Sequence, residues 1–359
     1  MLDNKGWQAE LRKKDNNGLG NCQFPRGTEI KINGNRDEVT ITLTAKGLYG
    51  NMQTDAAAFE AWALTLLCHC DVKKVAIELQ QGLEKPAKGP KEQHFERLLY
   101  RMTRFAALFP EQIIVDPALT SSARALEGDR NLFLNQPTMH RGELAAELEA
   151  RLTALFGQSG RHSESDLEKA LEISAAFRQT LGLKKLMRQW PVGLFRDRVA
   201  EGENRIFTGN KSAVDLIGIR NTELVLVELK KRGNCKVGAI SELLFYSSLM
   251  RDALKKLFRF EDRPPRRNCE VTRTDIMGCT SISAVLLAPD FHPLIRNPEI
   301  IARLNAALAS PDWSKMPIQL DVVRIDSIPD NPGEDFSFSW LSRASAGNAN
   351  AGVRGAAAG

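Results

Sequence analysis

Residues 211–230 read KSAVDLIGIRNTELVLVELK, and their pattern predicts the central strands of the second half of the chain. It contains two apolar runs, residues 213–219 and residues 223–229, on either side of a short polar turn. Runs that are apolar on both faces are typical of central strands that are covered on both sides. We therefore expect an antiparallel hairpin inside a sheet, with Ile219 paired to Leu224.

Three charged residues stand in or directly after these apolar runs. The symmetric hairpin places Asp215 directly opposite Glu228, and the two-residue period of a strand puts Lys230 on the same face as Glu228. Two carboxylates whose Cβ atoms are about 5 Å apart repel each other, and an apolar sheet makes that repulsion costly. A divalent cation would remove the penalty, and carboxylate oxygens suit Mg²⁺ or Mn²⁺. The sequence therefore predicts a metal ion held by Asp215, Glu228 and the backbone carbonyl of Leu229.

The ammonium group of Lys230 completes the predicted chemistry. It would lie beside a metal-bound water, where it can orient that water or stabilise negative charge that develops on a phosphate. Carboxylates, a metal ion and an ammonium together are what phosphodiester hydrolysis requires. The alternative is a solvated strand end in which Glu228 simply contacts Lys230.

The flanking segments extend the hairpin into a mixed α/β unit. The sequence predicts a helix over residues 165–190, a strand over 192–199, the two hairpin strands, a helix over 237–258 and a strand over 281–287. A helix near residues 298–309 and a strand over 318–325 follow. The first six of these elements have the order α-β-β-β-α-β.

VDLIGIRNTELVLVELK, followed by VGAISELLFY, resembles the core of the PD-(D/E)xK, or restriction-endonuclease-like, nuclease superfamily. The resemblance covers residues 165–290 and implies a restriction-endonuclease-like core sheet flanked by helices. By position it implies that Asp215 and Glu228 are metal ligands and that Lys230 is the catalytic lysine. It also implies a catalytic role for Glu242, where many members have a Gln.

The resemblance further implies a glutamate on the first core helix, for which Glu168 and Glu172 are the candidates. Ordinary surface charge is the alternative for each of them. The implied activity is that of a Mg²⁺- or Mn²⁺-dependent endonuclease that acts on DNA rather than RNA, in restriction, anti-phage defence or DNA processing. Two other functions stay open. One is an RNA-directed nuclease effector that a signal or partner switches, and the other is a non-catalytic nucleic-acid-binding or assembly module.

The distribution of charge along the chain favours a polyanionic partner. The formal net charge is +5, and residues 186–275 hold 18 Lys and Arg against 12 Asp and Glu. The excess therefore lies around the hairpin, where basic side chains can contact phosphate groups. The candidates for these contacts are Lys211, Lys231, Arg232, Lys236, Arg263, Arg266 and Arg267. A solubilising loop is the alternative for the arginines.

Length and composition limit the organisation of the chain. Its 359 residues, 43% hydrophobic and 26% charged, exclude wholesale disorder and allow two or three domains. We predict an N-terminal α+β recognition or assembly domain over residues 1–140, which begins with a loose polar arm and a strand pair within residues 29–45. A nuclease-like domain over residues 141–343 and a disordered Ala/Gly tail over 344–359 follow.

The same features predict where the protein works. No apolar run is long enough to cross a membrane, the first residues lack the apolar segment of a secretory signal, and six cysteines in a chain of this length fit a reducing compartment. We therefore expect a cytoplasmic protein without membrane contact. A homodimer or a partner protein of a defence system is a further expectation of the nuclease reading.

Overall fold

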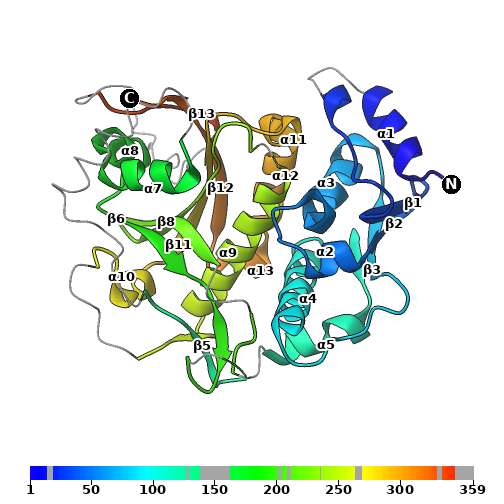
Figure 1. Cartoon of the computed structure of the whole chain (residues 1–359), viewed down its shortest axis with the longest axis horizontal. Coiled ribbons are helices and arrows are strands. Elements are labelled where there is room, and N and C mark those ends of the chain that lie inside the picture. The colour runs from blue at the N-terminus through cyan, green and yellow to red at the C-terminus, as the bar shows by residue number, and fades with distance from the viewer. Residues whose placement is uncertain are drawn as a thin grey trace, which may run out of the picture.

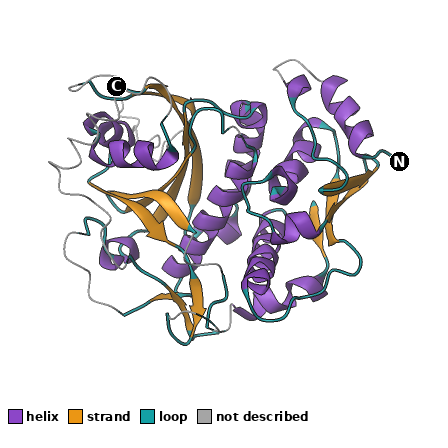
Figure 2. Ribbon diagram, in the orientation of Figure 1, coloured by secondary structure: helices purple, strands orange, loops and turns teal. Residues whose placement is uncertain are grey.

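The structure is a computed structural model, and it describes residues 1–13, 19–126, 129–137, 162–199, 202, 204–207, 212–234, 236–262, 269–329 and 334–343. This described part is mixed α/β, with three sheets and helices around them (Figures 1 and 2). The predicted tail over 344–359 lies outside the described residues. Within the described ranges, no helix combines the length and the apolar character needed to cross a membrane.

The N-terminal part is built on a four-stranded sheet. Its strands lie in the order β1-β2-β3-β4, with β1 antiparallel to β2 and the others parallel. The predicted strand pair within residues 29–45 is confirmed, because Ile32 pairs with Ile41. The elements are α1 (Asn4–Lys13), β1 (Ile30–Gly34), β2 (Glu38–Leu43), α2 (Ala45–Tyr49), α3 (Phe59–His69), β3 (Lys74–Leu79), α4 (Pro90–Leu108), β4 (Ile113–Val115), α5 (Pro117–Ala125) and β5 (Leu132–Leu134).

The predicted loose arm at the N-terminus is wrong for its first residues, which form helix α1. Two apolar side chains one turn apart, Trp7 and Leu11, are fully buried and dock this otherwise polar helix on the core. Asn4 fixes its start, because its amide donates to the carbonyl of Ile30 at 2.9 Å and its oxygen accepts from Ile32 N–H at 2.8 Å. The segment is rich in helix formers such as Gln8, Ala9 and Glu10, and the packing of its two apolar side chains stabilises it as a helix.

The C-terminal part is built on a six-stranded sheet in the order β13-β12-β11-β9-β8-β6. Strands β9, β11 and β12 are parallel to one another, and β8 is antiparallel to β9 and β6. The elements are α7 (Glu164–Ile173), α8 (Ala175–Leu181), β6 (Lys185–Pro191), β7 (Leu194–Arg196), β8 (Ala213–Arg220), β9 (Glu223–Leu229), α9 (Gly238–Leu254), β10 (Arg259–Phe260), α10 (Arg273–Met277), β11 (Ser281–Ala288), α11 (Pro293–Arg296), α12 (Pro298–Leu308), α13 (Pro311–Ser314), β12 (Ile318–Ser327) and β13 (Ser337–Ser342).

The predicted hairpin register is confirmed from the pair of Arg220 and Glu223 to the pair of Leu216 and Val227. The ladder does not extend to the predicted pair of Asp215 and Glu228. Asn221 in the turn has a φ of 55°, the left-handed conformation that a two-residue hairpin turn requires. The parallel strand β11 covers the other edge of β9, where Leu226 pairs with Ala284. The hairpin is therefore central in the sheet, as its apolar faces predict.

The prediction of one helix over residues 165–190 is wrong in its second half. The chain forms two helices, α7 and α8, and then turns at Gly182, whose φ of 66° ends α8. Residues 185–191 form strand β6, which pairs with β8. The predicted strand over 192–199 shrinks to β7, which belongs with β5 and β10 to a separate three-stranded sheet. Among the strands of the six-stranded sheet and the longer helices beside it, the predicted order of helix, three strands, helix and strand is kept. The first of the three strands is β6 instead of the predicted strand over 192–199.

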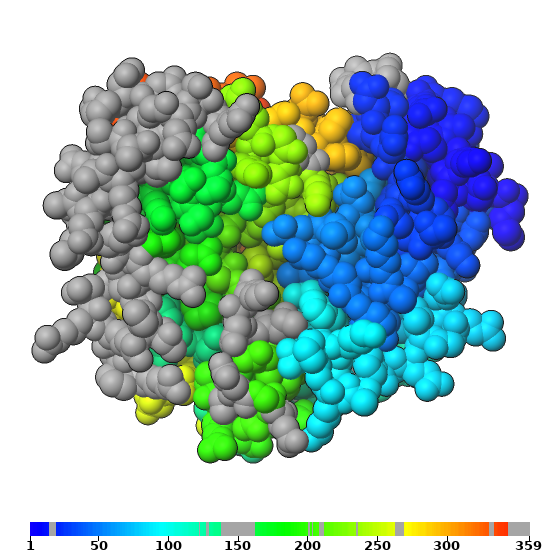
Figure 3. Space-filling model, viewed as in Figure 1, coloured from blue at the N-terminus to red at the C-terminus, as the bar shows by residue number. Residues whose placement is uncertain are grey.

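Helix α9 lies between the six-stranded sheet and the N-terminal helices (Figure 1). One hydrophobic core runs through both parts of the chain, from Trp7 and Trp62 to Leu249 and Trp313. In the space-filling view the blue and cyan residues of the N-terminal part abut the green residues of the second half (Figure 3). A second core lies between the other face of the sheet, α7 and α8. The division into domains at residue 140 stays a prediction.

Candidate functional site

The hairpin opens at its end, and Asp215 lies at that point. The ladder between β8 and β9 stops at the pair Leu216 and Val227. Beyond it, the backbone N–H of Leu229 donates to Oδ2 of Asp215 at 2.8 Å. A side chain thus takes the place of a strand-to-strand bond, and the two strands separate where the predicted site residues lie.

The neighbouring strand β6 is irregular at the same level. Gln189 lies between the β6 residues that pair with Leu216 and Val214 of β8, and it has a φ of 57°. A non-glycine residue in this left-handed region is strained. The conformation lets the amide of Gln189 donate to Oε2 of Glu168 in α7 at 2.7 Å. Nothing in the sequence indicated that Gln189 lies near the site, because its segment is predicted to be helical.

Lys230 joins carboxylates from two elements. Its ammonium donates to Oε1 of Glu228 in β9 and lies 3.2 Å from Oε2 of Glu242 in α9. The three residues are almost completely buried, with exposed fractions of 2 to 5%. The structure therefore brings Glu242 to the end of the hairpin, where the resemblance expected it. Together Asp215, Glu228, Lys230 and Glu242 form what we call the carboxylate cluster.

The two candidate glutamates of the first core helix are both buried, so ordinary surface charge is excluded for them. Glu168 accepts a hydrogen bond from the amide of Gln189, and its negative charge contributes to raising the pKa of Asp215. Glu172 instead accepts from Nε of Arg188 at 3.1 Å and from the backbone N–H of Arg188 at 3.2 Å. Glu168 therefore borders the carboxylate cluster, whereas Glu172 fixes α7 to β6.

The cluster holds more carboxyl groups than cations, and its electrostatics reflect this. Burial, together with the charges of Asp215 and Glu242, raises the pKa of Glu228 well above its usual range. Burial also raises the pKa of Asp215 to about 8, against the opposing effect of Lys230. Burial alone would lower the pKa of Lys230, but the carboxylates of Glu228, Glu242 and Asp215 outweigh it and raise that pKa. Lys230 is therefore a cation, and the carboxyl groups compete for it.

One buried carboxylate oxygen of the cluster has no partner among the described residues. Oε2 of Glu228 is buried and makes no hydrogen bond there, whereas Oε2 of Glu242, also without a hydrogen bond, lies 3.2 Å from the ammonium of Lys230. A buried carboxylate oxygen without a partner is costly, and either a proton or a cation would satisfy it. A bound proton and a bound cation would each reduce the excess of negative charge in the cluster.

The donor set fits a hard divalent cation in its chemistry. Oε2 of Glu228 is unsatisfied, and Asp215 uses only Oδ2 for the N–H of Leu229. In the described ranges, no three Asp, Glu, His or Cys side chains gather around one point in a metal-binding arrangement. Mg²⁺ commonly binds through one or two carboxylates and keeps several waters, so two side-chain ligands suffice for it. The role of the Leu229 carbonyl stays a prediction.

The predicted phosphate-contacting residues divide into two groups. Lys231, Arg232 and Lys236 are exposed on the loop that leads from β9 to α9, directly after Lys230. The other four, Lys211, Arg263, Arg266 and Arg267, lie outside the described residues. The three described basic side chains therefore lie on one exposed loop that follows Lys230 in the sequence.

A small pocket connects this loop with the cluster. Glu228, Lys230 and Lys236 line it together with Asp290 and His292, which follow β11. The imidazole of His292 accepts from Leu294 N–H at 3.2 Å, and burial lowers its pKa to about 4. His292 is therefore neutral at pH 7 and caps α11.

A comparison with known proteins finds no family model, no curated protein and no solved structure that matches the chain.

Proposed function

We propose that the protein is a metal-dependent nuclease of the PD-(D/E)xK type that hydrolyses phosphodiester bonds, in DNA rather than RNA. The observation that carries this proposal is the carboxylate cluster. It holds one lysine among three carboxyl groups at the open end of a central hairpin, and Glu228 retains a buried oxygen without a partner. Such an imbalance of charge costs stability, and it is typical of functional sites.

In this proposal Asp215 and Glu228 hold Mg²⁺ or Mn²⁺. The ion would supply a water of lowered pKa and neutralise the two carboxylates. Lys230 stabilises negative charge on the phosphate, and Glu242 keeps its ammonium in place. Lys231, Arg232 and Lys236 contact phosphates of the bound strand, which positions it without reading its sequence.

The fold supports the proposal through the order of its elements. Helices α7 and α8, strands β6, β8 and β9, helix α9 and strand β11 occur in the order that the resemblance implies. Among the described residues, only the short strands β7 and β10 and the short helix α10 come between them. Asp215 lies on the second of these strands, the Glu-x-Lys sequence ends the third, and Glu242 lies on the next helix. Each residue thus occupies the element on which the superfamily carries its counterpart.

A cleavage assay with a matched pair of variants tests the proposal. Wild type, Lys230→Met and Lys31→Met are incubated with DNA and with RNA in Mg²⁺ and in Mn²⁺. Because Lys230 lies in the cluster and Lys31 is exposed on β1, we expect Lys230→Met to lose about 10²-fold or more in rate and Lys31→Met to keep the wild-type rate within about twofold. Absence of metal-dependent cleavage by the wild type, or equal rates for the two variants, contradicts the proposal. Cleavage of RNA alone supports the effector alternative.

A second function, that of a non-catalytic nucleic-acid-binding module, is favoured by one contact. The ammonium of Lys230 already bridges Glu228 and Glu242, so the ion pair can serve as a buried structural link. This function predicts salt-dependent DNA binding by the wild type without cleavage in any divalent metal. It also predicts that Glu228→Gln binds DNA as the wild type does.

A further inference from the structure

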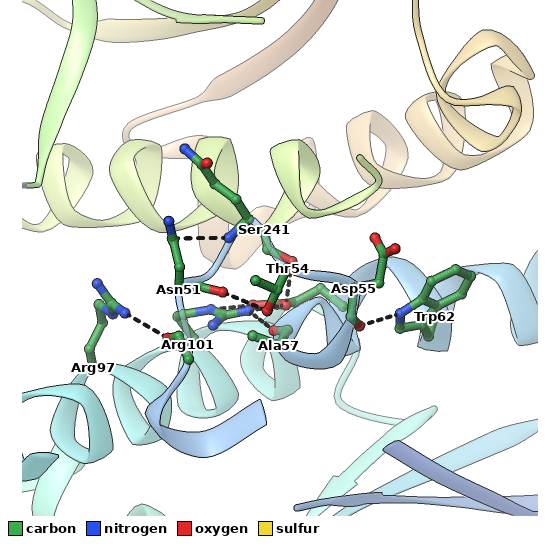
Figure 4. A network of polar contacts seen from close by, with 11 residues as sticks. Asn51, Thr54, Asp55, Ala57, Trp62, Arg97, Arg101 and Ser241 are labelled. Carbon is green, nitrogen blue, oxygen red and sulfur yellow. Dashed lines mark hydrogen bonds and ion pairs between the residues drawn. The ribbon is translucent and has the colours of Figure 1, made fainter. Parts of the chain in front are cut away.

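Helix α9 carries Glu242 into the carboxylate cluster. The N-terminal part of the chain contacts this helix at the preceding residue, Ser241. Ser241 is fully buried, and its hydroxyl donates to Oε2 of Glu60 in α3 at 2.7 Å. Figure 4 shows Ser241 on α9 directly against the segment that holds Thr54, Asp55 and Ala57. The neighbour of a proposed catalytic residue is thus bound to a part of the chain 181 positions away.

Glu60 is itself held in a fixed geometry. Arg101 of α4 donates from Nε to Oε1 at 2.8 Å and from Nη2 to Oε2 at 2.6 Å. The same guanidinium donates to the carbonyl of Ala57 at 2.7 Å and lies 4.8 Å from the ring centroid of Phe59. A bidentate pair of this kind is rigid. We call Glu60, Arg101 and Ser241 the helix clamp.

The first residue of α9 makes a second close contact with the same segment. A Cβ atom at Gly238 would lie 2.4 Å from the backbone oxygen of Gln53. Only glycine permits this approach, because backbone cannot give way as the end of a flexible side chain can. The start of α9 is therefore fitted to the loop that precedes α3.

The far end of α9 is tied to α4 as well. Asp252 is buried, and it accepts from the hydroxyl of Tyr100 at 2.7 Å and forms an ion pair with Arg104 at 2.6 Å. Helix α4 thus contributes to holding both ends of α9, through Arg101 and through Tyr100 and Arg104. Helix α9 also packs on β9 and β11, and the N-terminal part of the chain contributes to its position on the sheet through these contacts at both ends.

We infer that Ser241, Glu60 and Arg101 are positioning residues that act through Glu242 on Lys230, an inference that rests on the proposed nuclease function. Glu242 reaches Lys230 from a helix that these residues hold. When the bond from Ser241 to Glu60 is lost, the first turns of α9 gain freedom, and the contact between Glu242 and Lys230 loosens. The N-terminal part of the chain is then a component of the catalytic unit as well as a recognition element.

The test compares two serines of the same helix. Ser241 and Ser247 are both fully buried, but the hydroxyl of Ser247 donates to the carbonyl of Leu243 within α9. We expect Ser241→Ala to lower kcat about tenfold with KM unchanged, because positioning within a site affects the chemical step. Ser247→Ala should keep kcat within about twofold, since it breaks no contact with the N-terminal part.

A double variant shows whether Ser241 acts through Glu242. In the Glu242→Gln background, Ser241→Ala should cause no further loss of kcat, because residues that act in one chain of contacts are not additive. Ser247→Ala should remain as neutral there as in the wild type. Additive losses for Ser241→Ala and Glu242→Gln would overturn the inference.

A readout without metal or nucleic acid separates this inference from the proposed function. Hydrogen exchange of the backbone amides over residues 239–244 should accelerate in Ser241→Ala and stay unchanged in Ser247→Ala. If the wild type fails to cleave nucleic acid but the exchange differs in this way, the nuclease proposal is wrong while the positioning of α9 stands. Equal exchange in the two variants overturns the positioning whatever the activity.

Discussion

The two buried groups of charges at the start of α9 differ in their balance. In the helix clamp, Glu60 is paired with Arg101 in a bidentate geometry, and its oxygens also serve Ser241. In the carboxylate cluster, Lys230 pairs with Glu228 and Glu242 at once, and Oε2 of Glu228 is buried without a hydrogen bond to the described residues. Both carboxylate oxygens of Glu60 in the helix clamp have partners, whereas the carboxylate cluster has more negative than positive groups.

This difference separates a structural role from a functional one. A satisfied buried pair orients the elements that carry it, and its disruption leaves an unpaired charge. An unsatisfied cluster costs stability in the free protein, and a bound cation would recover that cost. The comparison therefore predicts opposite responses of the two groups to the same kinds of substitution.

The largest effect on stability is expected at the clamp. Arg101→Met leaves the carboxylate of Glu60 buried without its cation, which should lower the free energy of unfolding by about 3–5 kcal/mol. Urea unfolding followed by circular dichroism measures this. Arg36→Met is the control, because Arg36 pairs with Glu10 on the surface, and its midpoint should stay close to that of the wild type. Equal losses of unfolding free energy in the two variants would mean that the helix clamp does not stabilise the fold.

A pair of Glu→Gln variants should change stability in opposite directions. Glu228→Gln removes a repelled carboxylate from the cluster, so the metal-free protein should gain about 1–3 kcal/mol at pH 8. Glu60→Gln removes the partner of Arg101 and should lose stability. The measurement is again urea unfolding, with a chelator present. A loss of stability in Glu228→Gln comparable to that in Glu60→Gln would show the cluster to be a structural ion pair.

The cluster should also make stability depend on pH. The pKa of Asp215 is about 8 in the folded protein against an ordinary value of 3.8, so between these values the folded state binds more protons than the unfolded state. Stability of the metal-free protein should therefore fall as pH rises from about 4 to 8, by at most about 1.4 kcal/mol per pH unit for this group. Thermal unfolding across this range measures the slope. Asp215→Asn should reduce the slope, while the raised pKa of Glu228 keeps a part of it, and an unchanged slope in that variant would contradict the assignment.

A smaller effect is expected from the helix that carries Glu168. Ser163 caps α7 in a reciprocal arrangement, with its hydroxyl accepting from Asp166 N–H and Asp166 accepting from Ser163 N–H. Ser163→Ala should cost about 1 kcal/mol of stability. The resulting loosening of α7 should affect exchange near Gln189 and leave the clamp unchanged. Faster exchange at Ser241 in this variant would show that the two groups are not independent.

The sequence predicted the hairpin because one strong pattern was sufficient. Two apolar runs and a turn of fixed length leave a single register, and that register aligned Ile219 with Leu224 as observed. Four of the later elements, α9, β11, α12 and β12, followed from periodicity in the same way, whereas β10, β13, α10, α11 and α13 were not predicted. The candidate cluster then came from charges that interrupt an apolar pattern.

What the sequence concealed depends on distant packing. Strand β6 contains Leu, Lys, Met, Arg and Gln, which favour helices, and only its pairing with β8 makes it a strand. The burial of Glu168 and the irregular backbone of Gln189 follow from that pairing. The bond from Ser241 to Glu60 joins residues far apart in the chain, and periodicity carries no information on such contacts.

Titration of the protein with Mn²⁺ in the absence of nucleic acid shows whether the carboxylate cluster holds a metal ion. We expect saturable binding in a calorimetric titration of the wild type at pH 8, a loss of about tenfold or more in affinity for Glu228→Gln, and unchanged affinity for Glu172→Gln, whose residue lies outside the cluster. Absence of saturable binding, or equal affinities in wild type and Glu228→Gln, would contradict the proposed metal site.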